Sequence, residues 1–248
     1  MKLKIVHKSY SYAPQTKEEL KKIIEERLVD NPDADLNDID VSSITDMSEL
    51  FKGLDPHNID VSKWDVSNVK DMYSMFYECK NFNSDLSRWD VSNATNMNWM
   101  FWWCKKFNSD LSNWDMSNVE NMSYMFTYCE NFNSDLSRWD VSNADNMLWL
   151  FGNCKKFNSN LSKWDVSNVK DMNYMFYKCE NFKSDLSRWD VSGAKDMNGM
   201  FEGCTKFNSD LNAWDVSNVK SMFSMFFRCD SMKELPTWYI LNLSSSMK

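Results

Sequence analysis

Apolar and polar positions along this chain follow a pattern that returns every 25 residues. A Trp-Asp pair marks each copy, with its tryptophan at positions 64, 89, 114, 139, 164, 189 and 214. A degenerate copy places Ile39 one period before Trp64. A period of this length is typical of proteins whose units bury their apolar side by stacking on their neighbours. The pattern therefore predicts a repeat solenoid of about eight rungs over residues 31–232.

Each unit is predicted to hold a short strand and a second, shorter element. Leu86, Trp89 and Val91 precede a Ser-Asn turn signal, which favours a strand around residues 86–92. The apolar positions of the second element have the i, i+3, i+4, i+7 spacing of one helix face, as at Met72, Met75, Phe76 and Cys79. Because a segment of about eight residues is too short for a stable isolated helix, a short helix, a 3₁₀ turn and an irregular turn stay open as alternatives.

The two ends of the chain depart from the repeat and are predicted to cap it. In residues 1–30, Thr16 and Glu19 have capping-box spacing before an apolar helical stripe, so we expect a strand and a helix there. In residues 233–248, Pro236 interrupts the pattern. We expect a C-terminal cap there, followed by a frayed tail with the sequence LSSSMK.

Composition narrows the classes of partner. The net charge of −8 and a pI near 4.9 argue against a nucleic-acid surface, which needs clustered Lys and Arg. No stretch is long and apolar enough to span a bilayer, and the first residues lack the apolar run of a signal peptide. We therefore expect neither a nucleic-acid partner nor a membrane span.

One cysteine follows each recurring Met-Phe pair at a fixed distance. These residues are Cys79, Cys104, Cys129, Cys154, Cys179, Cys204 and Cys229. A fixed slot in every unit predicts a column of buried, reduced thiols. Disulfides between rungs would leave one thiol of an odd set unpaired, and neither His7 nor His57 joins a cysteine pair at zinc-ligand spacing.

Two columns of aspartate also recur. One holds Asp65, Asp90, Asp115, Asp140, Asp165, Asp190 and Asp215, and the other holds Asp60, Asp85, Asp110, Asp135, Asp185 and Asp210, interrupted by Asn160. Carboxylates stacked one rung apart must be solvated, bonded to turn N–H groups or neutralised by a cation. We expect solvation and turn hydrogen bonds and no cofactor, with calcium between rungs as the alternative.

Catalysis finds no support in the sequence. Carboxylate pairs recur in every unit, which suits a structural role better than a single site. No Gly-rich phosphate loop, GxSxG elbow or HExxH zinc motif is present. The chain is therefore predicted not to be an enzyme.

Four slots of each unit vary while the residues around them repeat. They are the x positions of M-x-x-M-F-x-x-C, and their aromatic members are Tyr73, Tyr77, Trp99, Trp102, Trp103, Tyr124, Tyr128, Trp149, Tyr174, Tyr177, Phe223 and Phe227. On a helix with its Met, Phe and Cys residues inward, all four slots face outward. Exposed slots without a role would hold Lys, Glu, Ser or Asn. The sequence therefore predicts an exposed aromatic ribbon.

A ribbon of exposed Tyr and Trp is typical of a binding surface, because rigid rings anchor a partner at low entropic cost. We predict a binding module that presents this ribbon to a protein partner, whether natural or engineered. One alternative is a sugar-binding adhesin, since flat rings stack on pyranose faces. The other is packing of the ribbon against another part of the chain, or against a second copy in a homodimer.

The unit F-N-S-D-L-S-x-W-D-V-S-N-V-x-D-M-x-x-M-F-x-x-C resembles the BspA-like repeat of bacterial surface proteins and mycoplasma lipoproteins. That repeat is related to the leucine-rich repeats of the Treponema type. The resemblance covers about residues 36–232 and rests on the WDVSN and MFxxC elements. It implies a right-handed, leucine-rich-repeat-like solenoid, a role in adhesion or protein binding, and an extracellular or bacterial-surface location. It carries over no catalytic residue.

Overall fold

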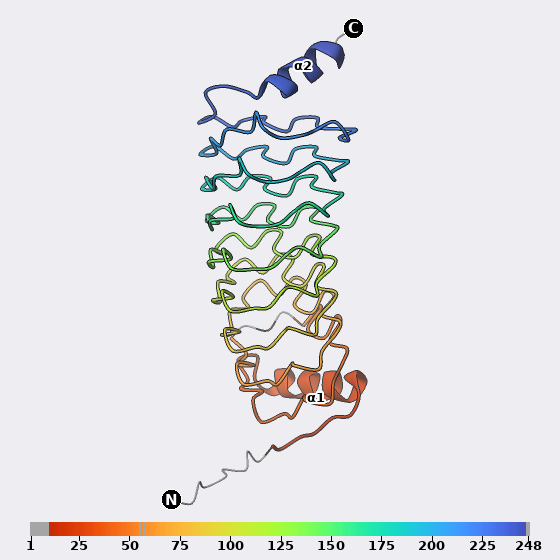
Figure 1. Cartoon of the computed structure of the whole chain (residues 1–248). Helices are drawn as coiled ribbons and strands as arrows, with labels where there is room; N and C mark the ends of the chain where they lie inside the picture. The colour runs from red at the N-terminus through yellow and green to blue at the C-terminus, as the bar shows by residue number, and fades with distance from the viewer. Residues whose placement is uncertain (1–9, 55, 57, 247–248) are drawn as a thin grey trace, which may run out of the picture.

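The computed structural model describes residues 10–54, 56 and 58–246. Over most of this length the chain winds into coils that are stacked along one axis (Figure 1). Parallel β-bridges join residues that lie one period apart in neighbouring coils, and the longest ladder runs through Asp46, Asp71, Asn96, Asn121, Asn146, Asp171, Asp196 and Ser221. The coils therefore have the period of the sequence repeat.

Backbone hydrogen bonds within a coil alternate with those between coils along the second element of each repeat. The amides of Ser74 and Glu78 donate to the carbonyls of Asn98 and Trp102 in the next coil, at 3.1 and 2.8 Å. The amide of Tyr77, which lies between them, donates to the carbonyl of Ser74 in its own coil at 3.1 Å. Along this element the linking amides point toward the C-terminal end of the stack, and the carbonyls that receive them point toward the N-terminal end.

This element is a series of turns, so of the three alternatives that the sequence leaves open the irregular turn is present and the helix is not. The third and seventh residues adopt left-handed backbone angles, with φ of 52° at Ser74 and 62° at Glu78. Such residues cannot belong to a right-handed helix. The strand expected around residues 86–92 is also absent, and a turn at residues 87–88 lies there instead.

The apolar columns form the core, as the repeat predicts. Phe76 stacks on Phe101 with ring centroids 5.6 Å apart, and Phe82 stacks on Phe107 at 5.8 Å. All four rings are fully buried. Because the ring of one coil is covered by the ring of the next, a coil buries its apolar side only within the stack.

The recurring tryptophans and cysteines are buried and find backbone acceptors in other coils. Trp89 Nε1 donates to the carbonyl of Val61 at 3.0 Å, and Cys104 Sγ donates to the carbonyl of Phe76 at 3.0 Å. All seven cysteines are buried, and none of them forms a disulfide. Burial raises the pKa of the Cys229 thiol to about 12. These columns of core indoles and reduced thiols match the sequence prediction.

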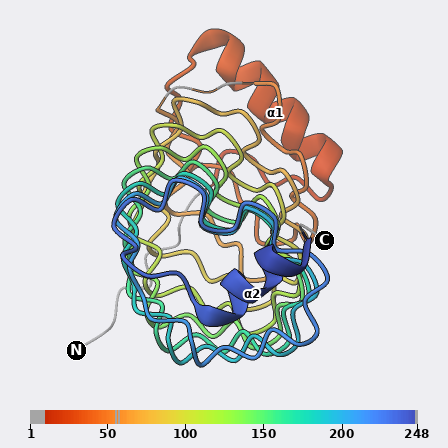
Figure 2. The same ribbon diagram turned by 90° about the horizontal axis from the view of Figure 1, so that it is seen from above.

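Helix α1 (Lys17–Asp30) lies along the first coil at the N-terminal end of the stack (Figures 1 and 2). The Thr16 hydroxyl caps it by accepting a hydrogen bond from an amide of the first turn, as the capping-box spacing predicts. The strand expected in the same cap falls partly on residues 1–9, which lie outside the described residues. Tyr12 forms one parallel bridge, with Ile39.

Helix α2 (Thr237–Ser246) lies over part of the last coil and leaves the rest of it uncovered (Figure 2). Trp238 stacks on Trp214 with ring centroids 6.4 Å apart, so it continues the tryptophan column by one layer. The helix extends through Ser246, into the tail that was expected to be frayed. Among the described residues, no helix is long and apolar enough to cross a bilayer.

Candidate functional site: an aromatic cluster along the stack

Nine aromatic side chains from the variable slots form one connected set, which we call the aromatic cluster. Its members are Tyr77, Trp99, Trp102, Trp103, Tyr124, Tyr128, Trp149, Tyr174 and Tyr177. Every one of them is half-buried and therefore keeps part of its ring at the surface. Residues that are far apart in the sequence are thus joined into a continuous aromatic surface along the stack.

The closest ring contacts lie in the middle of the aromatic cluster. Trp99 stacks on Tyr124 with centroids 4.0 Å apart and planes inclined by 15°. Tyr77 stacks on Trp102 at 4.6 Å, and Trp102 meets Trp103 edge-on at 5.3 Å. Aromatic pairs in these geometries gain about 0.5–1.5 kcal/mol beyond the area that they bury. The rings therefore hold each other in place before any partner arrives.

Glycines leave room for two of the large rings. A Cβ atom at Gly152 would lie 2.4 Å from the Trp149 ring, and one at Gly199 would lie 2.3 Å from the Tyr174 ring. A larger residue at either glycine would displace the ring beside it. The apolar pattern does not single out these glycines, although their place in slots that elsewhere hold aromatic residues is a signal for them.

Lysine side chains lie over several faces of the aromatic cluster. The ammonium of Lys52 lies 5.3 Å from the centroid of the Tyr77 ring. Lys80 and Lys105 lie 5.0 and 5.6 Å from the centroid of the Trp103 ring. Cations over ring faces are favourable contacts of about 0.5–1 kcal/mol at exposed sites. Lys52 and Lys105 also pair with Glu49 and Glu130, so this end of the cluster has a rim of mixed charge. Sequence reasoning missed this rim, because it requires knowing which coils are adjacent.

The backbone beneath six of the nine rings is left-handed. Their φ angles lie between 55° and 64°, at Trp99, Trp103, Tyr124, Tyr128, Trp149 and Tyr174. A left-handed conformation costs a bulky L-residue about 1–2 kcal/mol, whereas glycine adopts it freely. The same two columns hold Gly199 and Gly203 in another coil. Backbone preference therefore does not explain why tryptophan and tyrosine occupy these positions.

Three buried polar side-chain atoms of the described residues have no hydrogen-bond partner, and all three belong to variable slots. They are Asn98 Oδ1, Trp103 Nε1 and Asn153 Nδ2. Leaving a buried polar group unsatisfied costs about 1–3 kcal/mol. Such groups are rare in a structure optimised for stability alone. Within the described residues, the variable slots are therefore where buried polar groups remain to be satisfied by water or by a partner.

Three predicted ribbon residues lie apart from the aromatic cluster. Phe223 and Phe227 are 77% and 56% exposed, and like the half-buried Tyr73 they contact no other ring among the described residues. The expectation that all four slots face solvent is also wrong, since Ser74 and Thr127 are each 1% exposed. In a series of turns, unlike a helix face, residues of one slot alternate between core and surface according to their size.

The aspartate columns make turn hydrogen bonds, as the sequence predicts. Asp135 Oδ1 accepts the Ser137 amide at 3.0 Å, and Asn160 Oδ1 accepts the Ser162 amide at 3.1 Å. The bond from the Ser137 amide holds the pKa of Asp135 below its ordinary value. Within the described residues, no group of three or more His, Cys, Asp or Glu could hold a metal ion. The absence of a cofactor stays a prediction, with calcium between rungs as its alternative.

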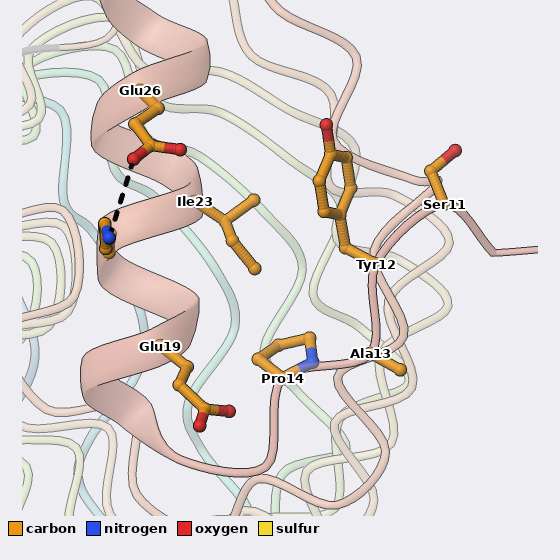
Figure 3. A pocket seen from close by; sticks show the side chains of 8 residues that line it. Ser11, Tyr12, Ala13, Pro14, Glu19, Ile23 and Glu26 are labelled. Atoms are coloured by element: carbon orange, nitrogen blue, oxygen red, sulfur yellow. Dashed lines mark ion pairs between the residues drawn. The ribbon is translucent and has the colours of Figure 1, made fainter.

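A shallow pocket lies at the N-terminal end, beside α1 and away from the aromatic cluster (Figure 3). Tyr12, Pro14 and Ile23 form its apolar side, and Lys22 and Glu26 form an ion pair of 4.0 Å at its edge. None of the predicted ribbon residues lines it. The aromatic cluster is thus a surface rather than the lining of this pocket.

A chain of stacked coils with the same core columns in each coil belongs to the class of repeat proteins. The family model described as "Mycoplasma protein of unknown function, DUF285" matches residues 19–139 and 125–239, which together include most of the chain. The protein belongs to this family. No curated protein and no solved structure matches the chain.

Proposed function

We propose that this protein is a non-enzymatic binding module whose aromatic cluster contacts a protein partner. The scaffold in this proposal is a right-handed solenoid related to leucine-rich repeats. The observation that carries the proposal is the left-handed backbone under six half-exposed tryptophan and tyrosine side chains. Residues that are kept at a conformational cost, where glycine would fit freely, are typical of functional surfaces.

The packing of the rings supports recognition by a preformed surface. Because Trp99 already contacts both Trp102 and Tyr124, a partner that covers these rings would immobilise few additional rotamers. Large rigid rings of this kind contribute about 2 kcal/mol or more each when they are central to an interface. The lysines over Tyr77 and Trp103, together with the paired Glu49 and Glu130, favour a partner whose rim carries complementary charges of both signs, which would add specificity.

The resemblance of the repeat to BspA-like repeats supports display at a bacterial surface, where the module would act as an adhesin. An engineered or rapidly diversified binder would use the same surface. In both cases the repeated core holds the shape, and the variable slots determine the partner.

The proposal is tested with a variant that changes three central rings to residues that other coils carry in the same columns. The substitutions are Trp99→Ser, Trp102→Thr and Trp103→Asn, after Ser74, Thr127 and Asn153. The matched control is Phe223→Ser with Phe227→Ser, which removes two exposed rings outside the aromatic cluster. Circular dichroism establishes that both variants are folded. Quantitative pull-down from an extract of cells and secreted glycoproteins then compares them with the parent.

We expect a partner that the parent and the control retain and that the three-ring variant loses, with affinity reduced about a hundredfold or more. Release of that partner by free sugars would favour the carbohydrate-binding alternative. A particle size that grows with concentration in the parent alone would favour a homodimer through the cluster. Capture of the same partners by all three folded proteins would disprove a binding role for the aromatic cluster.

A further inference from the structure

Amides at the C-terminal side of each interior coil are covered by carbonyls of the following coil. In the coil before the last, the Gly199 amide donates to the carbonyl of Phe223 and the Gly203 amide donates to the carbonyl of Phe227, each at 2.8 Å. The same pairing recurs throughout the stack. Each coil therefore ends in a row of donors that another backbone segment must satisfy.

The last coil keeps this row open. The amides of Met222, Ser224 and Arg228 have no acceptor anywhere in the described part of the chain. In the middle of the row, Phe226 packs against α2, where its ring meets the Tyr239 ring edge-on with centroids 5.0 Å apart. Ser224 and Arg228 have φ of 54° and 58°, the same left-handed geometry that presents these amides in interior coils. The row is therefore preformed for an added layer of backbone.

Apolar side chains are exposed beside this row. Phe223 and Phe227 flank it with 77% and 56% of their surfaces exposed. On α2, Ile240, Leu241 and Leu243 are 47%, 70% and 40% exposed. Most of the exposed large apolar side chains of the described residues thus gather at one end of the molecule, which is typical of an interaction surface.

The direction of the backbone groups identifies what fits there. Two copies that met through their last coils would place donors against donors. A second copy in head-to-tail order would have to present the carbonyls of its first coil, but α1 lies along that coil (Figures 1 and 2). Lys17 of α1 binds Asp46 and Ser48 of that coil at 2.7 and 2.8 Å. Neither arrangement of a second copy satisfies the row, which favours a segment of a different polypeptide.

We propose that residues 221–229 form a docking edge for a backbone segment of another polypeptide. That segment presents carbonyls at alternate residues to the amides of Met222, Ser224 and Arg228, as one more coil of the stack would. Its apolar side chains cover Phe223 and Phe227. This is addition of a backbone layer to an open edge, in which main-chain hydrogen bonds give affinity and the flanking side chains give specificity.

Hydrogen exchange of single amides, followed by NMR on the full chain, tests whether the edge is open. The amides of Ser224 and Arg228 are expected to exchange about a hundredfold or more faster than those of Gly199 and Gly203, which differ in position by one period. The probe for docking is a synthetic peptide with the sequence of residues 195–207 and the change Cys204→Ser. In the structure, that segment covers the corresponding amides of residues 172–178.

The peptide is expected to bind saturably and to slow exchange at the edge amides, whereas a scrambled peptide does neither. The variant with Phe223→Ser and Phe227→Ser should bind it about tenfold more weakly or worse. The folded variant with Trp99→Ser and Trp102→Thr should bind it as the parent does, which separates this edge from the aromatic cluster.

Several results would overturn the proposal. One is protection of the edge amides equal to that of Gly199 and Gly203 without any added partner. Another is the absence of binding at millimolar peptide. Protection of the edge amides by a self-association that Phe223→Ser with Phe227→Ser abolishes would assign the edge to a second copy. Equal protection by inorganic phosphate would assign it to anions.

Discussion

Two residues of each coil's turn element adopt left-handed backbone angles. Their side chains differ in how far their contacts offset the cost of that conformation. Trp99 stacks on Tyr124 at 4.0 Å, which offsets part of the cost of about 1–2 kcal/mol that each residue carries. Lys178, with φ of 54°, is exposed, and its ammonium lies 4.9 Å from the centroid of the Tyr177 ring. Because its side chain gains little, Lys178 is where the backbone strain is easiest to measure.

Lys178→Gly is expected to be more stable than Lys178→Ala by about 0.5–1 kcal/mol. Both substitutions remove the ammonium, but only glycine relieves the left-handed strain of about 1–2 kcal/mol. The net difference is smaller than this strain, because glycine also increases the conformational entropy of the unfolded chain. Lys220 is the matched control, because it is exposed and its φ is not positive. There the alanine variant should be the more stable one. Urea denaturation of the four variants gives both differences, and the same order at both positions would contradict a strained backbone at Lys178.

At the scale of the element, the aspartate turns are predicted to depend mainly on an acceptor oxygen, with only a small contribution from its charge. Asp135→Asn should lie within about 0.5 kcal/mol of the parent protein, because Asn160 already makes the same turn bond. Asp135→Ala should lose about 1 kcal/mol, because the Ser137 amide then has no acceptor in the turn. Guanidinium denaturation at neutral pH measures both. Equal losses in the two variants would show that the carboxylate charge is what matters.

The pKa of Asp171 is raised, whereas that of Asp135 is lowered, so the two residues are expected to affect stability oppositely as pH changes. Burial, followed by repulsion from Asp196, raises the pKa of Asp171 above its ordinary value. The ionised form is therefore disfavoured in the folded state, so Asp171 lowers stability at neutral pH, and this cost disappears as pH falls through the raised pKa. Asp171→Asn should raise the free energy of unfolding at pH 7 by less than about 1 kcal/mol, since solvent screens a half-buried carboxyl. The gain should shrink toward pH 4.

The control for this measurement is Asp135→Asn, where the sign is reversed. The lowered pKa of Asp135 means that its carboxylate adds stability above the ordinary pKa, and that this contribution is lost as pH falls through the lowered value. Urea denaturation midpoints of the parent and both variants at pH 7, 5 and 4 show whether each substitution raises or lowers stability and how the change depends on pH. A gain from Asp171→Asn that does not change with pH would contradict a titrating carboxyl as its cause.

The core columns were predictable from the sequence, whereas the conformation of the variable segment was not. A repeat that places Phe76 and Cys79 at fixed slots can bury them only by stacking, whatever the local backbone. The spacing of these apolar residues fits one face of a helix. Consecutive turns bury the same residues, so the spacing does not distinguish the two conformations. The sequence signal for left-handed turns is glycine at Gly53, Gly199 and Gly203, with φ of 81°, 55° and 76°. In the other coils, aromatic, polar or charged residues occupy most of these positions and hide that signal.

The extent of the aromatic surface was predictable only in part, for a related reason. A list of variable slots does not show which rings touch, because contacts depend on which coils are adjacent and on the size of the residue between two rings. Phe223 belongs to the same set of slots as Tyr174, yet it is separated from the aromatic cluster where the intervening coil carries glycine. Whether an aromatic residue belongs to the aromatic cluster therefore depends on the residues in the adjacent coils and not on its neighbours in the sequence.

At the scale of the whole molecule, contacts reach mainly the adjacent coils, so a complete coil should be removable. Deleting residues 195–219 joins Ala194 to Lys220, which keeps every core column in register. All nine rings of the aromatic cluster lie outside the deleted segment. Ser224 would then occupy the place of Gly199, where a Cβ atom meets the Tyr174 ring at 2.3 Å, so the deletion variant also carries Ser224→Gly.

This shortened protein is expected to unfold cooperatively at a lower temperature than the parent, because one interface between neighbouring coils is lost. Deleting residues 195–206 instead shifts the later columns by half a period, so the coils beyond the deletion should lose their packing. Thermal denaturation followed by circular dichroism compares the two. If both deletions abolish cooperative unfolding, the stack is not built from independent coils. If the shortened protein folds but no longer retains the partner captured by the parent, the binding surface extends past Tyr177 onto the glycine-bearing coil, whereas retention confines it to the aromatic cluster.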